Sequence, residues 1–168
     1  MSSMLEEEKK EEVSLDELLK RFEEYANEPG LLDAFVLTYL EPYMLKSILA
    51  TNADAMKKAE AIESFGDLMA SYSALHTIYF WFAEFASQYP EEGHFKKDME
   101  EIVRTMQEVA KRVIELYFEI KKARTLDVII MDFRYLASKL QDKISLFAYH
   151  VLDYIAELRF SKQASSTP

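Results

Sequence analysis

Hydrophobic residues recur every three or four positions over most of the chain, which is the spacing of one face of an α-helix. The first such stretch covers residues 15–26. Ser14 and Glu17 form a capping box at its start, and Val13 and Leu18 are placed to form a hydrophobic staple. Residues 27–30, which include a proline and a glycine, end the pattern. The sequence therefore begins with a short predicted helix.

Two more helices are predicted between residues 31 and 88. The first covers about residues 31–50, and Pro42 inside it should kink or split the helix because proline lacks a backbone N–H. Thr51, Asn52 and Asp54 then provide an N-cap for a helix that runs to about Gln88. The second half of that helix is apolar on nearly every side, so it is either central in the fold or covered by another chain.

The remaining sequence predicts two long helices. After a break at Tyr89, Pro90 and Gly93, apolar residues step alternately by three and four, which is the a/d seam of a helix bundle. The seam consists of Met99, Ile102, Met106, Val109, Val113, Leu116 and Ile120. A final helix is predicted over about residues 126–160. We expect a turn at Arg124–Thr125, because one continuous helix over residues 95–160 would be about 100 Å long and would require a second chain to pack against.

These elements predict an all-α fold, an antiparallel bundle of four long helices plus a short N-terminal helix, with more than about 70% helix. We expect residues 13–161 to form a single domain, between a charged flexible tail over residues 1–12 and a polar C-terminal tail over residues 162–168. The apolar stretches are far shorter than the roughly 20 residues of a membrane span, so no membrane association is predicted.

Charge and composition narrow the function. With 20 Lys+Arg against 30 Asp+Glu, the formal net charge is −10, which disfavours autonomous binding to nucleic acid and to anionic membranes. There is no cysteine, which excludes disulfides, thiolate metal sites and a cysteine nucleophile. The charged start of the chain does not resemble a secretory signal, so we expect a cytoplasmic protein.

The three histidines offer the main route to chemistry. His76 and His150 lie on different predicted helices and could ligate a metal or haem if they faced each other, although partly buried histidines that bond to neighbouring groups are the commoner case. Glu91 and His94 have the spacing of a di-iron ligand pair, but the motif occurs once and beside Pro90. With no phosphate loop or nucleophile elbow either, we predict no catalytic, metal or cofactor residues and no enzymatic activity.

The aromatic content, 10 Tyr, 11 Phe and 1 Trp, is the strongest functional signal. Aromatic residues are enriched in interface cores, and the alternative is that the rings fill the protein's own core. A weak basic cluster at the end of the fourth helix could contact an acidic group or simply complement the helix dipole. The predicted partner-binding residues are Tyr79, Trp81, Phe82, Phe85, Tyr89, Arg112, Lys121, Lys122 and Arg124.

We therefore predict a non-enzymatic protein-interaction module. It would be an accessory or inhibitory subunit that docks on a larger assembly with a basic surface, in one form by presenting carboxylates in place of nucleic-acid phosphates. The alternatives are a self-assembling helical protein, such as a homodimer or an assembly unit, and a small helical subunit of a nucleoprotein complex.

Overall fold

The computed structural model describes residues 13–89 and 93–166 of the 168-residue chain. Helix accounts for 89% of the structure, and the described residues contain no strand. The predicted all-α fold of five helices, four long and one short at the N-terminus, is confirmed. The predicted N-terminal tail, Pro90, Glu91 and Glu92 lie outside the described residues.

The helical segments follow the predicted boundaries closely. They are α2 (Leu15–Tyr25), α3 (Pro29–Phe35), the π-turn η1 (Val36–Leu40), α4 (Glu41–Ala50), α5 (Ala55–Gln88), α6 (Gly93–Ile120) and α7 (Asp127–Ser166). The last helix continues to Ser166, six residues beyond its expected end at Phe160. The turn between α6 and α7 is confirmed, since no helix spans residues 121–126.

Local chemistry explains where the helices begin. The Ser14 hydroxyl accepts a hydrogen bond from the Glu17 backbone N–H at 3.2 Å, which is one half of the predicted capping box. Asp54 caps α5 in the same way, since its carboxylate accepts from the Lys57 N–H at 2.9 Å. The prediction of this N-cap is therefore confirmed.

The expected disturbance at Pro42 takes the form of a π-turn. Segments α3, η1 and α4 follow one another without a break, so they form one helix with a wider turn in the middle. The Glu41 N–H bonds to the Val36 carbonyl, five residues back. The wider turn just before Pro42 makes room for a ring that would otherwise crowd the carbonyl four residues before it.

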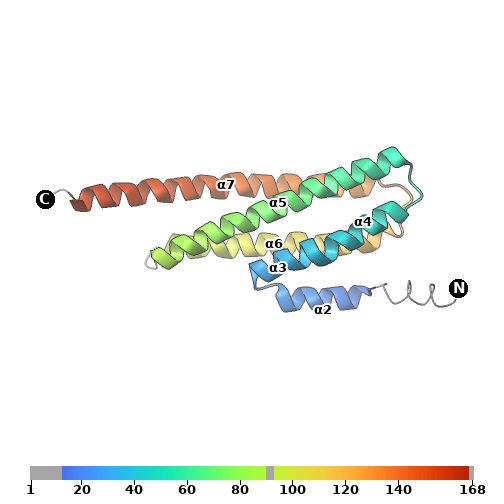
Figure 1. Cartoon of the computed structure of the whole chain (residues 1–168), viewed down its shortest axis with the longest axis horizontal. Coiled ribbons are helices and arrows are strands. Elements are labelled where there is room, and N and C mark those ends of the chain that lie inside the picture. The colour runs from blue at the N-terminus through green and yellow to red at the C-terminus, as the bar shows by residue number, and fades with distance from the viewer. Residues whose placement is uncertain (1–12, 90–92, 167–168) are drawn as a thin grey trace.

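Helices α5 and α6 form the centre of the bundle. Helix α7 packs along α5 on one side, while α3 and α4 pack on α5 and α6 and α2 is the outermost helix, against α6 and α3. Figure 1 shows this order, with α7 and α2 at opposite edges of the molecule and the C-terminal end of α7 reaching beyond the end of α5. Helix α7 is therefore covered by the rest of the chain on one side only.

The predicted seam of α6 forms the middle of the core. Six of its seven residues are buried, and Met99 packs against the core while half-buried. On the adjacent faces, acidic residues of α6 pair with basic residues of α7: Glu101 with Lys143 at 2.7 Å and Glu108 with Lys139 at 3.2 Å. These pairs fix the orientation of α7 on α6, although each exposed pair contributes little stability.

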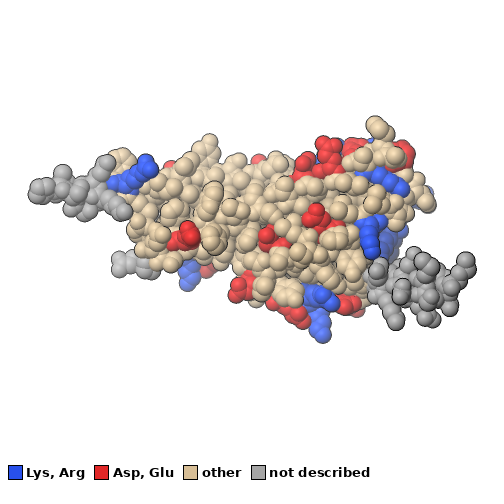
Figure 2. Space-filling model, viewed as in Figure 1, with Lys and Arg blue, Asp and Glu red and all other residues tan. Residues whose placement is uncertain are grey.

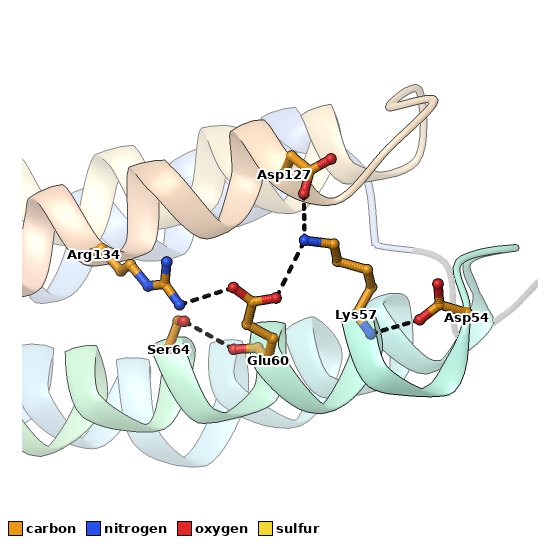
Figure 3. A network of polar contacts seen from close by, with 6 residues as sticks. All are labelled: Asp54, Lys57, Glu60, Ser64, Asp127 and Arg134. Carbon is orange, nitrogen blue, oxygen red and sulfur yellow. Dashed lines mark hydrogen bonds and ion pairs between the residues drawn. The ribbon is translucent and has the colours of Figure 1, made fainter.

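A second polar network joins the first turns of α5 and α7 (Figure 3). The Lys57 ammonium lies between Asp127 of α7, at 2.7 Å, and Glu60, at 3.3 Å. The other carboxylate oxygen of Glu60 accepts from Arg134 of α7 at 2.9 Å. Mainly because of the hydrogen bond to Asp127, the pKa of Lys57 is raised above its ordinary value. The network therefore links the N-terminal part of α7 to the N-terminal part of α5.

Candidate docking surface on α7

The outward face of α7 carries large apolar side chains that the chain leaves uncovered. Tyr135 and Tyr149 each keep 68% of their surface exposed, and Met131 is equally exposed. The other exposed apolar residues of this helix are Val128, Leu146, Leu152 and Phe160. Isolated apolar residues are normal on a protein surface, whereas several large apolar residues exposed along one helix mark a candidate site of interaction.

A shallow apolar groove adjoins this face where α5 and α7 run side by side. It has a volume of about 370 Å³ and lies between Trp81 and Phe85 of α5 and Val151, Leu152 and Ile155 of α7. Trp81 keeps 46% of its surface exposed. Figure 2 shows few charged side chains on the half of the molecule where α5 ends, whereas Asp, Glu, Lys and Arg gather on the other half.

The predicted aromatic residues separate into three environments. Trp81 and Phe85 line the groove beside α7. Phe82 is fully buried, in edge contact with Phe147 and Tyr154, so it offers no surface to a partner. The helical period explains the division, because residues 100° apart on α5 face α7, the core and the solvent in turn.

Tyr79 and Tyr89 lie elsewhere. Tyr79 borders a different groove with Asn27 and Met99, on the α6 side of α5. Burial raises the pKa of the Tyr79 phenol. Tyr89 is half-buried at the C-terminus of α5, where its N–H bonds to the Phe85 carbonyl. The aromatic segment is therefore partly core and partly surface, and it does not form one continuous face.

The predicted basic residues do not form one patch. Arg112 is held by carboxylates of Glu115, Glu119 and Asp132 at 2.9–3.2 Å, and the hydrogen bond to Glu119 is the main reason that its pKa is raised. Lys121 and Arg124 border a polar cleft of about 540 Å³ at the end of the bundle. Because Arg112 is neutralised within the chain, it offers little positive charge to a partner.

Lys121 and Lys122 are exposed directly after the C-terminus of α6, at the end of the bundle. Lys121 lies 4.8 Å from the centre of the Tyr117 ring, a cation–π contact within the chain. Among the described residues, every buried side-chain nitrogen and oxygen atom has a hydrogen-bond partner, so none is left for a ligand in the cleft. This end of the molecule therefore has the character of an ordinary solvated surface.

His76 and His150 do not face each other. His76 Nδ1 lies 3.2 Å from Asp33 of α3, and His150 Nδ1 lies 3.2 Å from Asp98 of α6. Ser73 also donates to Asp33, at 3.3 Å. The carboxylate lies between the serine and the histidine there, whereas a nucleophilic relay places the imidazole in the middle. His94 is the second residue of α6, and its side chain lies outside the described residues.

Asp98 is the most buried acidic residue of the described chain, with 6% of its surface exposed. Its Oδ2 accepts a hydrogen bond from the Tyr154 hydroxyl at 2.8 Å and lies 3.2 Å from His150 Nδ1. The Tyr154 ring stands edge-on to Phe95 at 4.6 Å. The cluster is a polar tie between α6 and the distal half of α7, enclosed by aromatic rings.

Tyr72 and Tyr154 contribute most to the sensitivity of the fold to alkaline pH. Burial raises the pKa of Tyr72 well above its ordinary value of 10.0. Burial and the hydrogen bond to Asp98 raise the pKa of Tyr154 in the same direction. In the unfolded chain both phenols ionise near pH 10. Their contribution to stability is therefore complete below pH 10 and is lost as the pH rises towards the folded pKa values.

We expect the free energy of unfolding to fall as the pH is raised from about 9 to 11, with each such tyrosine adding up to about 1.4 kcal/mol per pH unit. Urea unfolding at a series of pH values measures the slope. Tyr72→Phe should make it shallower. Tyr135→Phe, which removes a phenol that water already reaches, should leave the slope unchanged. Equal slopes for the wild-type and Tyr72→Phe chains would contradict this expectation.

Sequence reasoning missed the exposed apolar side of α7. Met131, Tyr135, Tyr149 and Leu152 lie on the side of α7 opposite its buried residues, which include Phe133, Leu140 and Phe147. The sequence does contain this second set of apolar positions within residues 128–152, in addition to those that are buried. The set becomes meaningful only when the position of α7 at the edge of the bundle is known.

Within the described residues, no three His, Asp or Glu side chains are grouped so that they could hold a metal ion. None of the described helices combines the length and apolar character that crossing a membrane requires. Comparisons of the chain with protein-family models, with curated proteins and with solved structures find no match. The surface itself therefore carries the functional argument.

Proposed function

We propose that this protein is a non-enzymatic docking module that binds an apolar helix of a partner protein along the outward face of α7. The observation that carries the proposal is the row of exposed apolar and aromatic residues on a helix that the bundle covers on one side only. Helix-in-groove recognition uses such a row of anchors at helical spacing. The groove at Trp81 extends the row towards α5.

Charge adds a requirement on the partner. The net charge of −10 favours an assembly with a basic surface, because complementary charge speeds association. In this proposal the protein acts as an accessory subunit of a larger assembly. The absence of cysteine suits a reducing compartment, so the proposal places the protein in the cytoplasm.

The proposal is tested by charging the face. In the double variant Tyr135→Glu and Tyr149→Glu, both side chains are exposed, so the circular dichroism and thermal midpoint should remain as in the wild type. Loss of two central tyrosines should weaken binding at least about 100-fold, since tyrosines are frequent hot spots. Self-association by light scattering and capture of proteins from the source cells are the two measurements.

Phe80→Glu is the matched control, because Phe80 is an equally large exposed ring on α5, away from α7. Binding that is lost in the double variant and kept in the control supports the docking face. If neither self-association nor any captured protein depends on Tyr135 and Tyr149, the proposed function is wrong.

A further inference from the structure

The exposed face of α7 has a regular heptad spacing of its own. Seven exposed positions follow one another in steps of four and three residues, which keeps them on one line along the helix. They are Met131, Tyr135, Ser138, Asp142, Ser145, Tyr149 and Leu152. We refer to these seven residues as the outer stripe. Steps of this kind allow a second straight helix to follow the line closely.

The residue types along the outer stripe follow nearly the same order in both directions from its centre. Asp142 is at its centre, and a serine stands on each side of it, at Ser138 and Ser145. Tyr135 is seven residues before Asp142, and Tyr149 is seven residues after it. The stripe ends in a large apolar residue on both sides, Met131 and Leu152. The order of residue types is therefore symmetric about Asp142.

We infer that the partner seated on this face is a second copy of the chain, whose α7 lies antiparallel to the first with the two-fold axis at Asp142. The inference rests on the proposed function and names the occupant of the α7 face. Residues 127–160 carry 5 acidic and 4 basic side chains, so this face is nearly neutral, and the basic partner that the net charge of −10 favours is left to other parts of the surface. In a two-fold symmetric interface, if residue i of one chain contacts residue j of the other, then j also contacts i. A symmetric stripe meets that requirement because each tyrosine faces the other tyrosine, and each serine faces a serine.

The size of the stripe suits such a pair. From Met131 to Leu152 it is about 32 Å long at 1.5 Å per residue. Full burial of a tyrosine covers about 150–250 Å², so the 68% of Tyr135 and Tyr149 that is exposed amounts to roughly 400–700 Å² in a dimer. That is about a third of a standard protein interface of roughly 1,600 Å². Val128 and Ala156, fourteen residues either side of Asp142, extend the contact.

The middle of the stripe favours close approach of the two helices. Ser138 and Ser145 are small, so the helix backbones can come together between the two pairs of tyrosines. Lys139 and Lys143, which flank Asp142, are held by Glu108 and Glu101 of α6. Because these lysines are engaged with α6, they do not neutralise Asp142, and the two Asp142 carboxylates repel each other at the axis.

Engineered cysteines test the arrangement cleanly, because the chain has no cysteine of its own. The full-length chain should first show twice the mass of 19.6 kDa in light scattering at micromolar concentration. Under mild oxidation, Asp142→Cys should form a disulfide-linked dimer by itself. Ser138→Cys and Ser145→Cys should each remain uncrosslinked alone, because a residue and its own copy are then offset by about 9–12 Å along the axis, beyond disulfide reach.

A mixture of the Ser138→Cys and Ser145→Cys chains should crosslink, because these positions face each other across the axis within about one residue. Ala70→Cys, an exposed position on α5, is the control that should stay uncrosslinked. Asp142→Asn should tighten the dimer about two- to fivefold in dilution experiments, because it removes the carboxylate repulsion at the axis.

The outcomes separate the two proposals. Self-crosslinking of both serine positions would indicate a parallel pair and overturn the antiparallel arrangement. If the chain is monomeric at about 100 μM and no cysteine variant crosslinks, any dimer has a dissociation constant above that concentration. That result would overturn a second copy as the partner. If that monomer still captures another protein through Tyr135 and Tyr149, the proposed function stands and this inference alone fails.

Discussion

Replacement of Phe82 by alanine should lower the free energy of unfolding by about 3–5 kcal/mol, a large share of the stability of a small domain. Phe82 is fully buried and packs against three rings, those of Phe95, Phe147 and Tyr154, with ring centres 5.9–6.3 Å apart. Truncation removes the transfer free energy of the ring and leaves a cavity where α5, α6 and α7 meet. Urea unfolding followed by circular dichroism measures the change.

Phe80→Ala is the matched control, two residues away on the same helix. Phe80 keeps 57% of its surface exposed, so the same truncation should change the free energy of unfolding by less than about 1 kcal/mol. Similar losses for the two variants would mean that the assignment of these rings to core and surface is wrong. The comparison also tests the division of the aromatic residues of α5 into two groups. The buried rings stabilise the fold, and only the exposed rings are available to a partner.

Features that depend on nearby residues could be predicted from the sequence. The Ser14 and Asp54 caps, the a/d seam of α6 and the turn after Ile120 are all local patterns, and the structure confirms each of them. A cap needs only a side chain and an N–H three residues later, and a seam needs only a repeated spacing. These signals remain whatever surrounds the helix.

Features that depend on which helices are neighbours could not be predicted. Glu101 and Glu108 pair with lysines of α7, across 42 and 31 residues, rather than within α6. His76 and His150 each find a carboxylate on another helix. The outer stripe was invisible for the same reason, because a second apolar line on α7 acquires meaning only when no other helix covers it.

The same difference between patterns within one helix and contacts between helices applies to the aromatic residues predicted to bind a partner. Trp81 and Phe85 line the groove between α5 and α7, and their role in binding a partner stays a prediction. Phe82 was misplaced, since the sequence pattern alone does not show which side of an almost wholly apolar helix faces its neighbours. A partner for this surface remains a proposal that the cysteine and charge variants test.

Replacement of Asp98 by alanine should lower the free energy of unfolding by about 2–4 kcal/mol, the second large effect expected. Asp98 is buried, and it is the acceptor for the Tyr154 hydroxyl at 2.8 Å and the neighbour of His150 at 3.2 Å. Removing a buried acceptor costs more than the net value of its hydrogen bond, because the donors lose a partner in a site enclosed by rings. Thermal and urea unfolding measure the loss.

The exposed Asp153→Ala, one residue from Tyr154, is the control and should change stability by less than about 0.5 kcal/mol. A double-mutant cycle of Asp98→Ala with Tyr154→Phe should give a coupling free energy of about 1–3 kcal/mol, because the two side chains share one hydrogen bond. Additive losses would show that Asp98 acts through bulk alone. A coupled pair instead makes this bond the attachment of the distal half of α7 to α6, so that Tyr149 and Leu152, on the opposite side of the same helix segment, are presented to a partner on a fixed support.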